Sequence, residues 1–436
     1  MQFIVNPAAA TDATVVVPGD KSVSHRALML GSIADGTTRI SGFLAGEDCL
    51  STLSAMRAMG VRIERPAETE VIVHGVGLHG LNEAAAALDM GNSGTGMRLM
   101  AGLLSGQSFA SQLIGDESLS SRPMRRIIDP LQQMGAVIDS EDGRPPLTIH
   151  AGNALRSIDY ELPVASAQVK SAILLAGLYA DGTTSVAEPA VTRDHTERML
   201  ASMGIPVEKR GNRVAVTGGG RLRACDVRVP GDLSSAAFVI LAALLSDRAE
   251  VLIKNVGVNP TRTGVIDILQ SMGADISLEN PGLLGQEPVA DIRIRSSDLR
   301  GGPVDPQLVS LAIDEFPVLF VAAAAAGGKT SFTGIGELRV KESDRIASMA
   351  AGLRAMGIQV DESTDGAVVH GGRFQGARVD SFGDHRIAMS LAVAASVAAE
   401  TVTVCDVDAV NTSFPGFCEL MNALGMSVSA TPEGSH

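Results

Sequence analysis

The chain has 436 residues, of which 45% are hydrophobic, and a formal net charge of −14 from 35 basic and 49 acidic side chains. This length can bury a large core and predicts two or more domains. The acidic balance argues against a general nucleic-acid-binding protein, which needs a basic surface, but it allows a small anion to be bound in a locally basic site.

The N-terminal residues MQFIVNPAAATD lack the basic start and long apolar core of a signal peptide. Apolar runs such as FPVLFVAAAAA reach only about half of the ~20 residues that cross a bilayer. The four cysteines are far apart, which favours free, mostly buried thiols in a reducing compartment over disulfides or a zinc site. We therefore expect a cytoplasmic protein.

Two near-identical stretches mark the organisation of the chain. TVVVPGDKS (14–22) and DVRVPGDLS (226–234) both lead through Pro-Gly-Asp into a serine and an apolar segment. Because the copies lie about half a chain apart, we expect two similar domains. The first copy carries Lys21 where the second carries Leu233. Since the pattern accepts leucine there, we expect the lysine to serve function.

Each half also repeats a shorter pattern of helices and strands. Six segments are apolar nearly all round and predict helices that are buried on every side. They are ALMLGSIA, MRLMAGLLSG, SAILLAGLYA, AAFVILAALLS, FPVLFVAAAAA and IAMSLAVAAS. Six other helices are expected to end in a glycine, which suits a left-handed cap, before an alternating strand. These glycines are Gly60, Gly135, Gly204, Gly273, Gly357 and Gly425. The pattern predicts an α/β fold of two similar domains, each with three repeats.

Familiar cofactor motifs are incomplete. Gly328-Lys329-Thr330 resembles the end of a P-loop, but Ala323 stands where that motif needs glycine, so a helix-to-strand turn is favoured. GNSGTGMR (91–98) does not fit the dinucleotide fingerprint, and no metal-spaced His/Cys cluster or nucleophile elbow occurs. We expect neither a metal ion nor a cofactor.

Basic and small polar residues gather at the predicted starts of the apolar helices. Asp20 can cap the first of these helices beside Lys21 and Arg26, and the N–H groups of a helix start attract anions. The other starts carry Gly94 and Arg98, Ser166 to Gln168, and Asp384 to Arg386. Taken singly, each is more often a plain cap or a solvated charge. Together they favour an anion-binding site, because cations near buried helices need anionic partners.

Two further segments fit this hypothesis. RVKESDR (339–345), if helical, brings Lys341 and Glu342 within reach of Arg345 and suits either a surface helix or part of the anion site. Asp314, before an apolar helix, suits either a cap or a general base for a hydroxyl. The residues alone predict an enzyme that binds phosphorylated or carboxylated small molecules in a basic cleft between two domains.

Together, these segments resemble the 5-enolpyruvylshikimate-3-phosphate synthase family. The resemblance runs through PGDKSVSHR, GNSGTGMR, SSRPMRR, ASAQVKS, TRDHTER, DEFPVL, RVKESDR, DHRIAMS and TSFP. It implies two domains, each an inside-out α/β barrel of three βαβαββ units with buried helices. Residues 20–231 would form the first lobe, and residues 1–19 with 232–436 the second, discontinuous lobe.

The resemblance also implies a reaction. The family transfers the enolpyruvyl group of phosphoenolpyruvate to the 5-hydroxyl of shikimate 3-phosphate and releases phosphate, in chorismate and aromatic amino acid biosynthesis. The transfer is an addition–elimination through a tetrahedral intermediate, without a metal. We accordingly expect a monomer with these small-molecule substrates and with no nucleic-acid or membrane partner.

Matching motifs assign residues to the reaction. Shikimate 3-phosphate would be bound by Lys21, Ser22, Arg26, Ser166, Ala167, Gln168, Arg193, Asp314 and Lys341. Phosphoenolpyruvate would be bound by Lys21, Gly94, Arg122, Gln168, Arg345 and Arg386. Asp314 would take the proton of the attacking hydroxyl, and Glu342 and Lys21 would transfer protons at the methylene carbon and the bridging oxygen. His385 would lie close to the reacting atoms.

The chain departs from part of the family at Thr412 and at Glu337, where some members carry asparagine. A lysine of some members is replaced by Thr412, after Asn411, so a phosphate contact is either missing or supplied elsewhere. Gly94 leaves room for the herbicide glyphosate, whereas some tolerant members have alanine there. The S-A-Q and K-E-S-D-R variants resemble those of the tolerant members, so sensitivity and tolerance both stay open.

Two alternatives remain. The related enolpyruvyl transferase that acts on UDP-N-acetylglucosamine has a cysteine where this chain has Glu117, which argues against that activity. A non-catalytic module of the same fold is the second alternative, and the full set of acid, base and cations argues against it.

Overall fold

The computed structural model describes residues 1–152 and 154–433, and its chain divides into two compact units. The terminal unit consists of Met1–Pro18, Pro230–Gly282 and Pro288–His436. The central unit consists of Gly19–Val229 and the short segment Leu283–Glu287. Each unit has its own hydrophobic core. No sequence signal indicated that Leu283–Glu287 would belong with the central unit.

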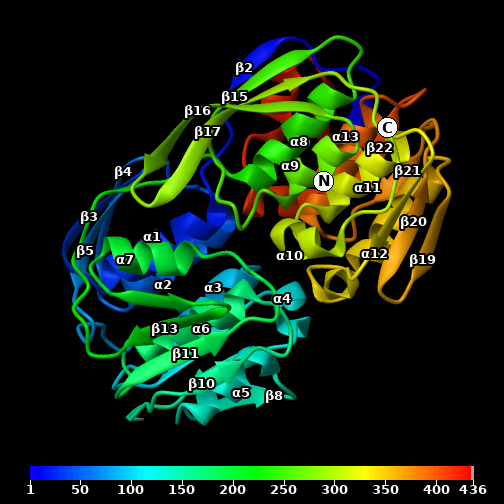
Figure 1. Ribbon diagram of the computed structural model, residues 1–436. Helices are drawn as coiled ribbons and strands as arrows, with labels where there is room; N and C mark the ends of the chain where they lie inside the picture. The colour runs from blue at the N-terminus through cyan, green and yellow to red at the C-terminus, as the bar shows by residue number, and fades with distance from the viewer. Residues whose placement is uncertain (153, 434–436) are drawn as a thin grey trace. The chain divides into compact units, whose positions relative to one another are not determined.

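The central unit combines helices with three four-stranded sheets (Figure 1). Its helices are α1 (Lys21–Ser32), α2 (Glu47–Ala58), α3 (Gly94–Leu104), α4 (Glu117–Ser121), α5 (Arg125–Gln133), α6 (Ala167–Gly177) and α7 (His195–Ser202). The strand order of one sheet is β14 (Val227–Arg228), β3 (Asp35–Ser41), β5 (Glu70–Val76) and β4 (Arg62–Ala67). The second runs β6 (Leu88–Asp89), β7 (Ser111–Ile114), β9 (Arg144–Ile149) and β8 (Ile138–Glu141). The third runs β10 (Asp159–Glu161), β11 (Thr183–Ala187), β13 (Arg213–Thr217) and β12 (Val207–Arg210).

The terminal unit also contains three sheets. The strand order of the first is β16 (Asp275–Leu284), β17 (Glu287–Arg295), β15 (Glu250–Gly257) and β2 (Ala13–Val15). The second has three strands, in the order β18 (Lys329–Thr333), β20 (Gly366–His370) and β19 (Val360–Ser363). The third runs β21 (Arg378–Asp380), β22 (Val402–Cys405), β1 (Gln2–Asn6) and β23 (Ser427–Thr431). The N-terminal strand β1 thus pairs with two strands from the end of the chain.

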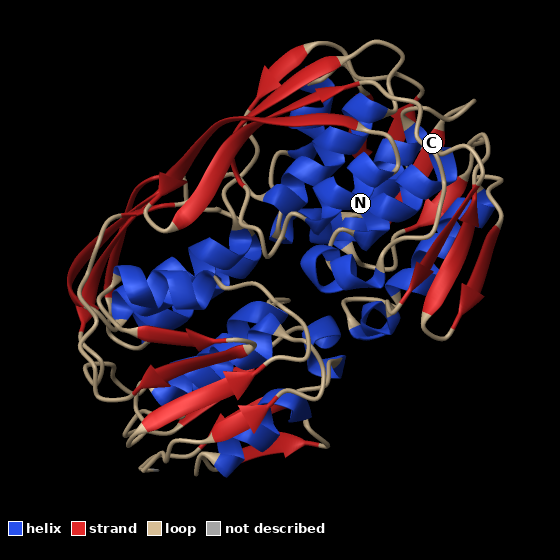
Figure 2. Ribbon diagram, viewed as in Figure 1, coloured by secondary structure: helices blue, strands red, loops and turns tan. Residues whose placement is uncertain are grey.

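The helices of the terminal unit are packed among these sheets (Figure 2). They are α8 (Leu233–Leu244), α9 (Gly264–Ser271), α10 (Val309–Ala312), α11 (Phe316–Ala325), α12 (Arg345–Ala355), α13 (His385–Ala395) and α14 (Phe417–Ala423). Three 3-10 turns complete the unit: η1 (Pro306–Leu308), η2 (Gly336–Val340) and η3 (Asp408–Thr412). The α/β fold class predicted from the sequence is confirmed.

The six apolar segments form the innermost helices, as predicted. They are α1, α3 and α6 in the central unit and α8, α11 and α13 in the terminal unit. Every residue of α8 and of α13 is buried, which confirms the expectation of helices covered on all sides. Among the described residues, no helix combines the length and the apolar character that a membrane crossing requires.

The glycine caps are also confirmed. All six adopt positive φ values: 89° at Gly60, 104° at Gly135, 86° at Gly204, 96° at Gly273, 84° at Gly357 and 99° at Gly425. A side chain in this region would clash with its own backbone, so glycine is favoured where each helix must turn into the next strand.

Candidate active site

The site residues predicted from sequence fall into two groups, one in each unit. The central unit holds Lys21, Ser22, Arg26, Gly94, Arg122, Ser166, Ala167, Gln168 and Arg193. The terminal unit holds Asp314, Lys341, Glu342, Arg345, His385 and Arg386. In the central group most members stand at or next to the N-terminal ends of α1, α3 and α6, where helix N–H groups favour anions. In the terminal group His385 and Arg386 begin α13, and Arg345 begins α12.

At the start of α1, Asp20 accepts a hydrogen bond from the Val23 N–H at 2.8 Å, which confirms the predicted cap. Lys21 follows, and its Nζ lies 2.9 Å from Oδ2 of Asp48. Asp48 lies in the first turn of α2 and is buried. Asp48 was not predicted as a site residue, because an aspartate in a first helical turn is usually only a favourable charge for the helix dipole.

Arg26 is buried one turn further along α1 and donates three hydrogen bonds. They reach Oγ1 of Thr196 at 2.7 Å, Oγ of Ser171 at 2.9 Å and the carbonyl of Ser22 at 2.9 Å. Burial lowers the pKa of Arg26 to about 10, and the nearby negative charge of Glu197 opposes this shift. The guanidinium therefore stays charged at neutral pH and is held in a fixed orientation.

Two arginines converge on the start of α3. A Cβ atom placed on Gly94 would lie 3.0 Å from Nη1 of Arg122 and 3.2 Å from Nη1 of Arg98. Arg122 donates to Oδ1 of Asn92 at 2.6 Å, and Ser93 caps the helix by accepting from the Gly96 N–H at 3.0 Å. The glycine thus lets two cations and the helix start share one small space.

The start of α6 is linked to the same place. Ser166 caps this helix through the Val169 N–H at 3.4 Å. Gln168 accepts from Arg98 at 2.6 Å through Oε1 and donates from Nε2 to Oγ1 of Thr95 at 2.8 Å. These bonds join α6 to α3, so the amide of Gln168 is fixed by both of its polar atoms.

In the terminal unit, Asp314 lies between two cations. Its Oδ1 is 3.5 Å from Nζ of Lys341 and 3.5 Å from Nη1 of Arg345. Its backbone carbonyl accepts from Nη1 of Arg386 at 2.9 Å. The structure therefore brings together four residues that the sequence analysis assigned to one site.

Arg345 is the most buried cation of this group. Its Nη2 lies 2.7 Å from Oε2 of Glu342, and its Nε lies 2.8 Å from Oδ2 of Asp384. Burial acts against the charge, but the carboxylates of Asp384, Glu342 and Asp314 hold the pKa of Arg345 above its usual value. Arg345 is therefore a permanent cation. Asp384 also caps α13 through the Arg386 N–H, beside the buried His385.

Two structural details differ from the sequence-based alternatives. RVKESDR is not a helix: residues 341–343 form a bend, and α12 starts at Arg345 because Asp344 caps it through the Ala347 N–H at 3.0 Å. Asp314 does not cap α11, since Glu315 occupies the N-cap position and the carboxylate of Asp314 is directed to the neighbouring cations instead. The contact between Glu342 and Arg345 forms without a helix.

The second Pro-Gly-Asp copy has a structural role. Asp232 caps α8, and Leu233 is 0% exposed in the core of the terminal unit. In the central unit the corresponding Lys21 side chain is 16% exposed and paired with an acid. The two copies thus share a backbone design and differ in whether the first helical side chain enters the core.

Thr412 has a local partner: its hydroxyl donates to the carbonyl of Ala409 at 2.7 Å within η3. It is buried, and η3 packs against α13.

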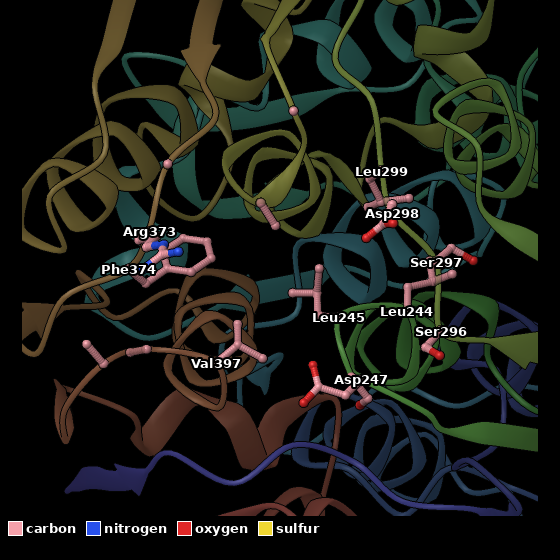
Figure 3. Close-up of a pocket in the computed structure, with 16 residues that line it drawn as sticks. Leu244, Leu245, Asp247, Ser296, Ser297, Asp298, Leu299, Arg373, Phe374 and Val397 are labelled. Carbon is pink, nitrogen blue, oxygen red and sulfur yellow. The ribbon is translucent and has the colours of Figure 1, made fainter.

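A cavity of about 800 Å³ in the terminal unit does not coincide with these residues (Figure 3). It is lined by residues at the C-terminal ends of α8 and α11 and just beyond the C-terminal end of α13, including Leu245, Ala325 and Val397. Asp314 and His385 stand at the opposite, N-terminal ends, about 15 Å away along helices of 10 and 11 residues.

Comparisons with known proteins agree with the motifs. The family profile described as EPSP synthase (3-phosphoshikimate 1-carboxyvinyltransferase) matches residues 5–421. A 3-phosphoshikimate 1-carboxyvinyltransferase of Alkalilimnicola ehrlichii is 57% identical over 431 residues, which cover 98% of this chain and 97% of that protein. One of Methylococcus capsulatus is 56% identical and covers 98% of both chains.

A solved structure is similar along the same length. The EPSP synthase of Acinetobacter baumannii superposes with a TM-score of 0.88 at 52% identity, covering 98% of this chain and 100% of that one. With the family profile and relatives above half identity spanning nearly the whole sequence, the chain belongs to the EPSP synthase family.

Proposed function

We propose that the chain catalyses the 3-phosphoshikimate 1-carboxyvinyltransferase reaction. It transfers the enolpyruvyl group of phosphoenolpyruvate to the 5-hydroxyl of shikimate 3-phosphate and releases phosphate, in chorismate and aromatic amino acid biosynthesis. The observation that carries this conclusion is 57% identity along 98% of the chain to a relative of that name. The fixed cations and carboxylates of both units supply the chemistry that such a transfer needs.

We assign shikimate 3-phosphate chiefly to the central unit. Arg26 and Arg193 would bind this anion, and Ser22, Ser166, Ala167 and Gln168 would contribute polar groups at helix starts. Support comes from the burial of Arg26 and its three hydrogen bonds, which remove the rotational freedom that binding would otherwise cost. From the terminal unit, Lys341 and Asp314 would contact the same substrate.

Phosphoenolpyruvate is assigned to cations of both units. Arg122, with Gly94 and Gln168, forms one set, and Arg345 with Arg386 forms the other. The support is geometric: Gly94 allows Arg122 to approach the α3 start closely, and Arg386 is bonded to the backbone of Asp314. Permanent cations offset the mutual repulsion of two anionic substrates and stabilise the departing phosphate.

The proton transfers are assigned to three residues. Asp314 takes the proton from the 5-hydroxyl as its oxygen attacks C2 of phosphoenolpyruvate, and Glu342 donates a proton to the methylene carbon to complete the tetrahedral intermediate. Glu342 then takes a proton back from the new methyl group as the bond between C2 and the bridging oxygen breaks, and Lys21 donates a proton to that oxygen as phosphate leaves. Lys341 and Arg345 lie 3.5 Å from Asp314 Oδ1 and stabilise its charge, which supports the role of base.

We propose that each unit is an inside-out α/β barrel of three βαβαββ repeats. Three buried helices and three sheets per unit, together with the recurring glycine caps, support this description. We also propose a monomeric, cytoplasmic enzyme. Its four free cysteines agree with a reducing compartment, and light scattering of the purified protein tests the monomer.

One assay separates the proposal from its rivals. Phosphate release is measured with phosphoenolpyruvate and shikimate 3-phosphate, and in parallel with phosphoenolpyruvate and UDP-N-acetylglucosamine. We expect release with the first pair only. Release with the second pair alone would assign the chain to the cell-wall reaction, and no release with either pair would favour a binding module.

A further inference from the structure

A buried lysine of the central unit lies close to the groups that hold two predicted site residues, Arg26 and Arg193. Lys170 belongs to α6 and its side chain is 1% exposed. Its Nζ lies 2.9 Å from Oε2 of Glu188 and 2.8 Å from Oε1 of Glu197, and it donates to the carbonyl of Thr192 at 3.4 Å. None of the roles assigned above involves this cluster of Lys170, Glu188 and Glu197.

The cluster holds the backbone next to Arg193. Thr192 precedes that arginine, and its hydroxyl donates to Glu188 while its carbonyl accepts from Lys170. On the other side, the carboxylate of Asp194 accepts from Arg198 at 2.6 Å and from Lys209 at 2.9 Å. Both neighbours of Arg193 are therefore anchored, which restricts where its guanidinium can reach.

The same cluster lies beside the partners of Arg26. Ser171 follows Lys170 in α6, and Thr196 precedes Glu197 in α7. Thr196 donates to Ser171 at 2.8 Å, and both hydroxyls accept hydrogen bonds from Arg26. The ion pair between Lys170 and Glu197 thus joins α6 to α7 one residue away from the pair of hydroxyls that orients Arg26.

Stability alone does not explain a buried charge at this position. Burying an ammonium and two carboxylates costs desolvation energy, and well-packed apolar side chains of similar volume often do as well or better. What an apolar side chain could not do is donate to Glu188 and to the carbonyl of Thr192 while its charge pairs with Glu197. The geometry therefore points to orientation of neighbouring groups.

We propose that Lys170, with Glu188 and Glu197, is a positioning residue for the binding of shikimate 3-phosphate. It fixes the Thr192–Asp194 loop and the α6–α7 hydroxyl pair, so that Arg193 and Arg26 are in place before shikimate 3-phosphate binds. This inference rests on the proposed function. It predicts a selective effect on that substrate, because the cluster bonds to Thr192, next to Arg193, and lies one residue from the hydroxyls that hold Arg26.

The test compares Lys170→Met with the charge-balanced double variant Lys170→Met/Glu197→Gln. For each, kcat and both KM values are measured, and binding of shikimate 3-phosphate alone is measured by calorimetry. We expect KM and Kd for shikimate 3-phosphate to rise about tenfold, with kcat and the KM for phosphoenolpyruvate within about threefold of the unchanged protein. Thermal unfolding shows which variants are folded, and the double variant serves if the single one is not.

Lys254→Met is the control, because Lys254 also pairs with a carboxylate, that of Asp291, at 2.8 Å but belongs to the terminal unit. It should leave both KM values within about twofold. An unchanged KM for shikimate 3-phosphate in a folded Lys170 variant, or an equal rise of both KM values, would overturn the inference. If the unchanged protein neither binds shikimate 3-phosphate nor releases phosphate, the proposed function itself is wrong.

Discussion

The ammonium of Lys21 lies 2.9 Å from the carboxylate of Asp48, and both side chains are largely buried. A lysine at a helix start usually explores many rotamers in solvent, which costs entropy when a ligand fixes it. Here the ion pair with Asp48 holds the Lys21 ammonium in place before a ligand binds. The pair connects α1 to α2 and gives the first Pro-Gly-Asp copy a charged site at the position where the second copy has only packing.

Replacing Lys21 with leucine is expected to leave a folded protein and lower kcat/KM about 10²- to 10⁴-fold, since a proton donor and an anion contact are both lost. Asp48 loses its cation, so we also expect a stability loss of about 1–3 kcal/mol. The double variant Lys21→Leu/Asp48→Asn should recover stability and stay inactive. Circular dichroism, urea unfolding and phosphate release check these outcomes; near-normal turnover would contradict the role of Lys21.

Asp314→Asn should lower kcat about 10²- to 10⁴-fold, because the amide keeps the size of the side chain but cannot accept the hydroxyl proton. Steady-state kinetics with both substrates provide the measurement. Asp305→Asn is the control: Asp305 is an exposed cap, which asparagine replaces well, so its kinetics should match those of the unchanged protein. Equal kinetics for the two variants would exclude Asp314 as the base.

Gly94→Ala should raise the KM for phosphoenolpyruvate about tenfold with a smaller effect on shikimate 3-phosphate. The new Cβ atom would lie 3.0 Å from Arg122 Nη1, and Asn92 limits how far that guanidinium can retreat. Gly302→Ala is the control, because a Cβ atom there meets nothing within 4 Å. The measurement is the initial rate at varied phosphoenolpyruvate concentration. The same KM for phosphoenolpyruvate in both variants would refute the role of Gly94 in the close approach of Arg122.

His25 predicts a pH dependence of stability. Burial, aided by the charges of Lys21 and Arg26, lowers the pKa of this histidine to about 3, from 6.5. Between those values the unfolded chain binds more protons than the folded one, so stability rises with pH in this window and is lost as the pH falls. His25 should contribute a slope of about 1 kcal/mol per pH unit between pH 5 and 6.5.

His25→Asn tests this slope, since asparagine does not titrate and its amide can replace Nδ1, which lies 2.8 Å from Oγ1 of Thr52. Urea unfolding at several pH values should give a flatter profile for the variant over that range. The same slope in both proteins would show that groups other than His25 set the pH dependence of stability in this range.

Much of the fold could be read from local patterns. The innermost helices and their glycine turns depend on hydrophobic periodicity and on a backbone angle that glycine tolerates, and both are properties of short segments. The pairing of β1 with β22 and β23 was expected only in outline, because the family resemblance implied that residues 1–19 join the second lobe without giving a register.

The contacts around the site were much less predictable. Asp48 and Asp384 each meet a site cation from a distant segment, and in the sequence both look like ordinary residues of a helix start. The link from Gln168 to Arg98 joins two helices whose separation along the chain carries no periodic signal. A segment's pattern states which face is buried but not which other segment covers it.

The sequence by itself determined the two-fold duplication, the buried helices and the types of residue at their starts, because these follow from residue order and side-chain chemistry. Only the tertiary structure decided that Lys21 is held by Asp48, that Asp314 lies between Lys341 and Arg345, and that Lys170 is buried behind Arg26. These relationships depend on long-range packing, in which distances of a few ångström between remote residues are set by the whole unit.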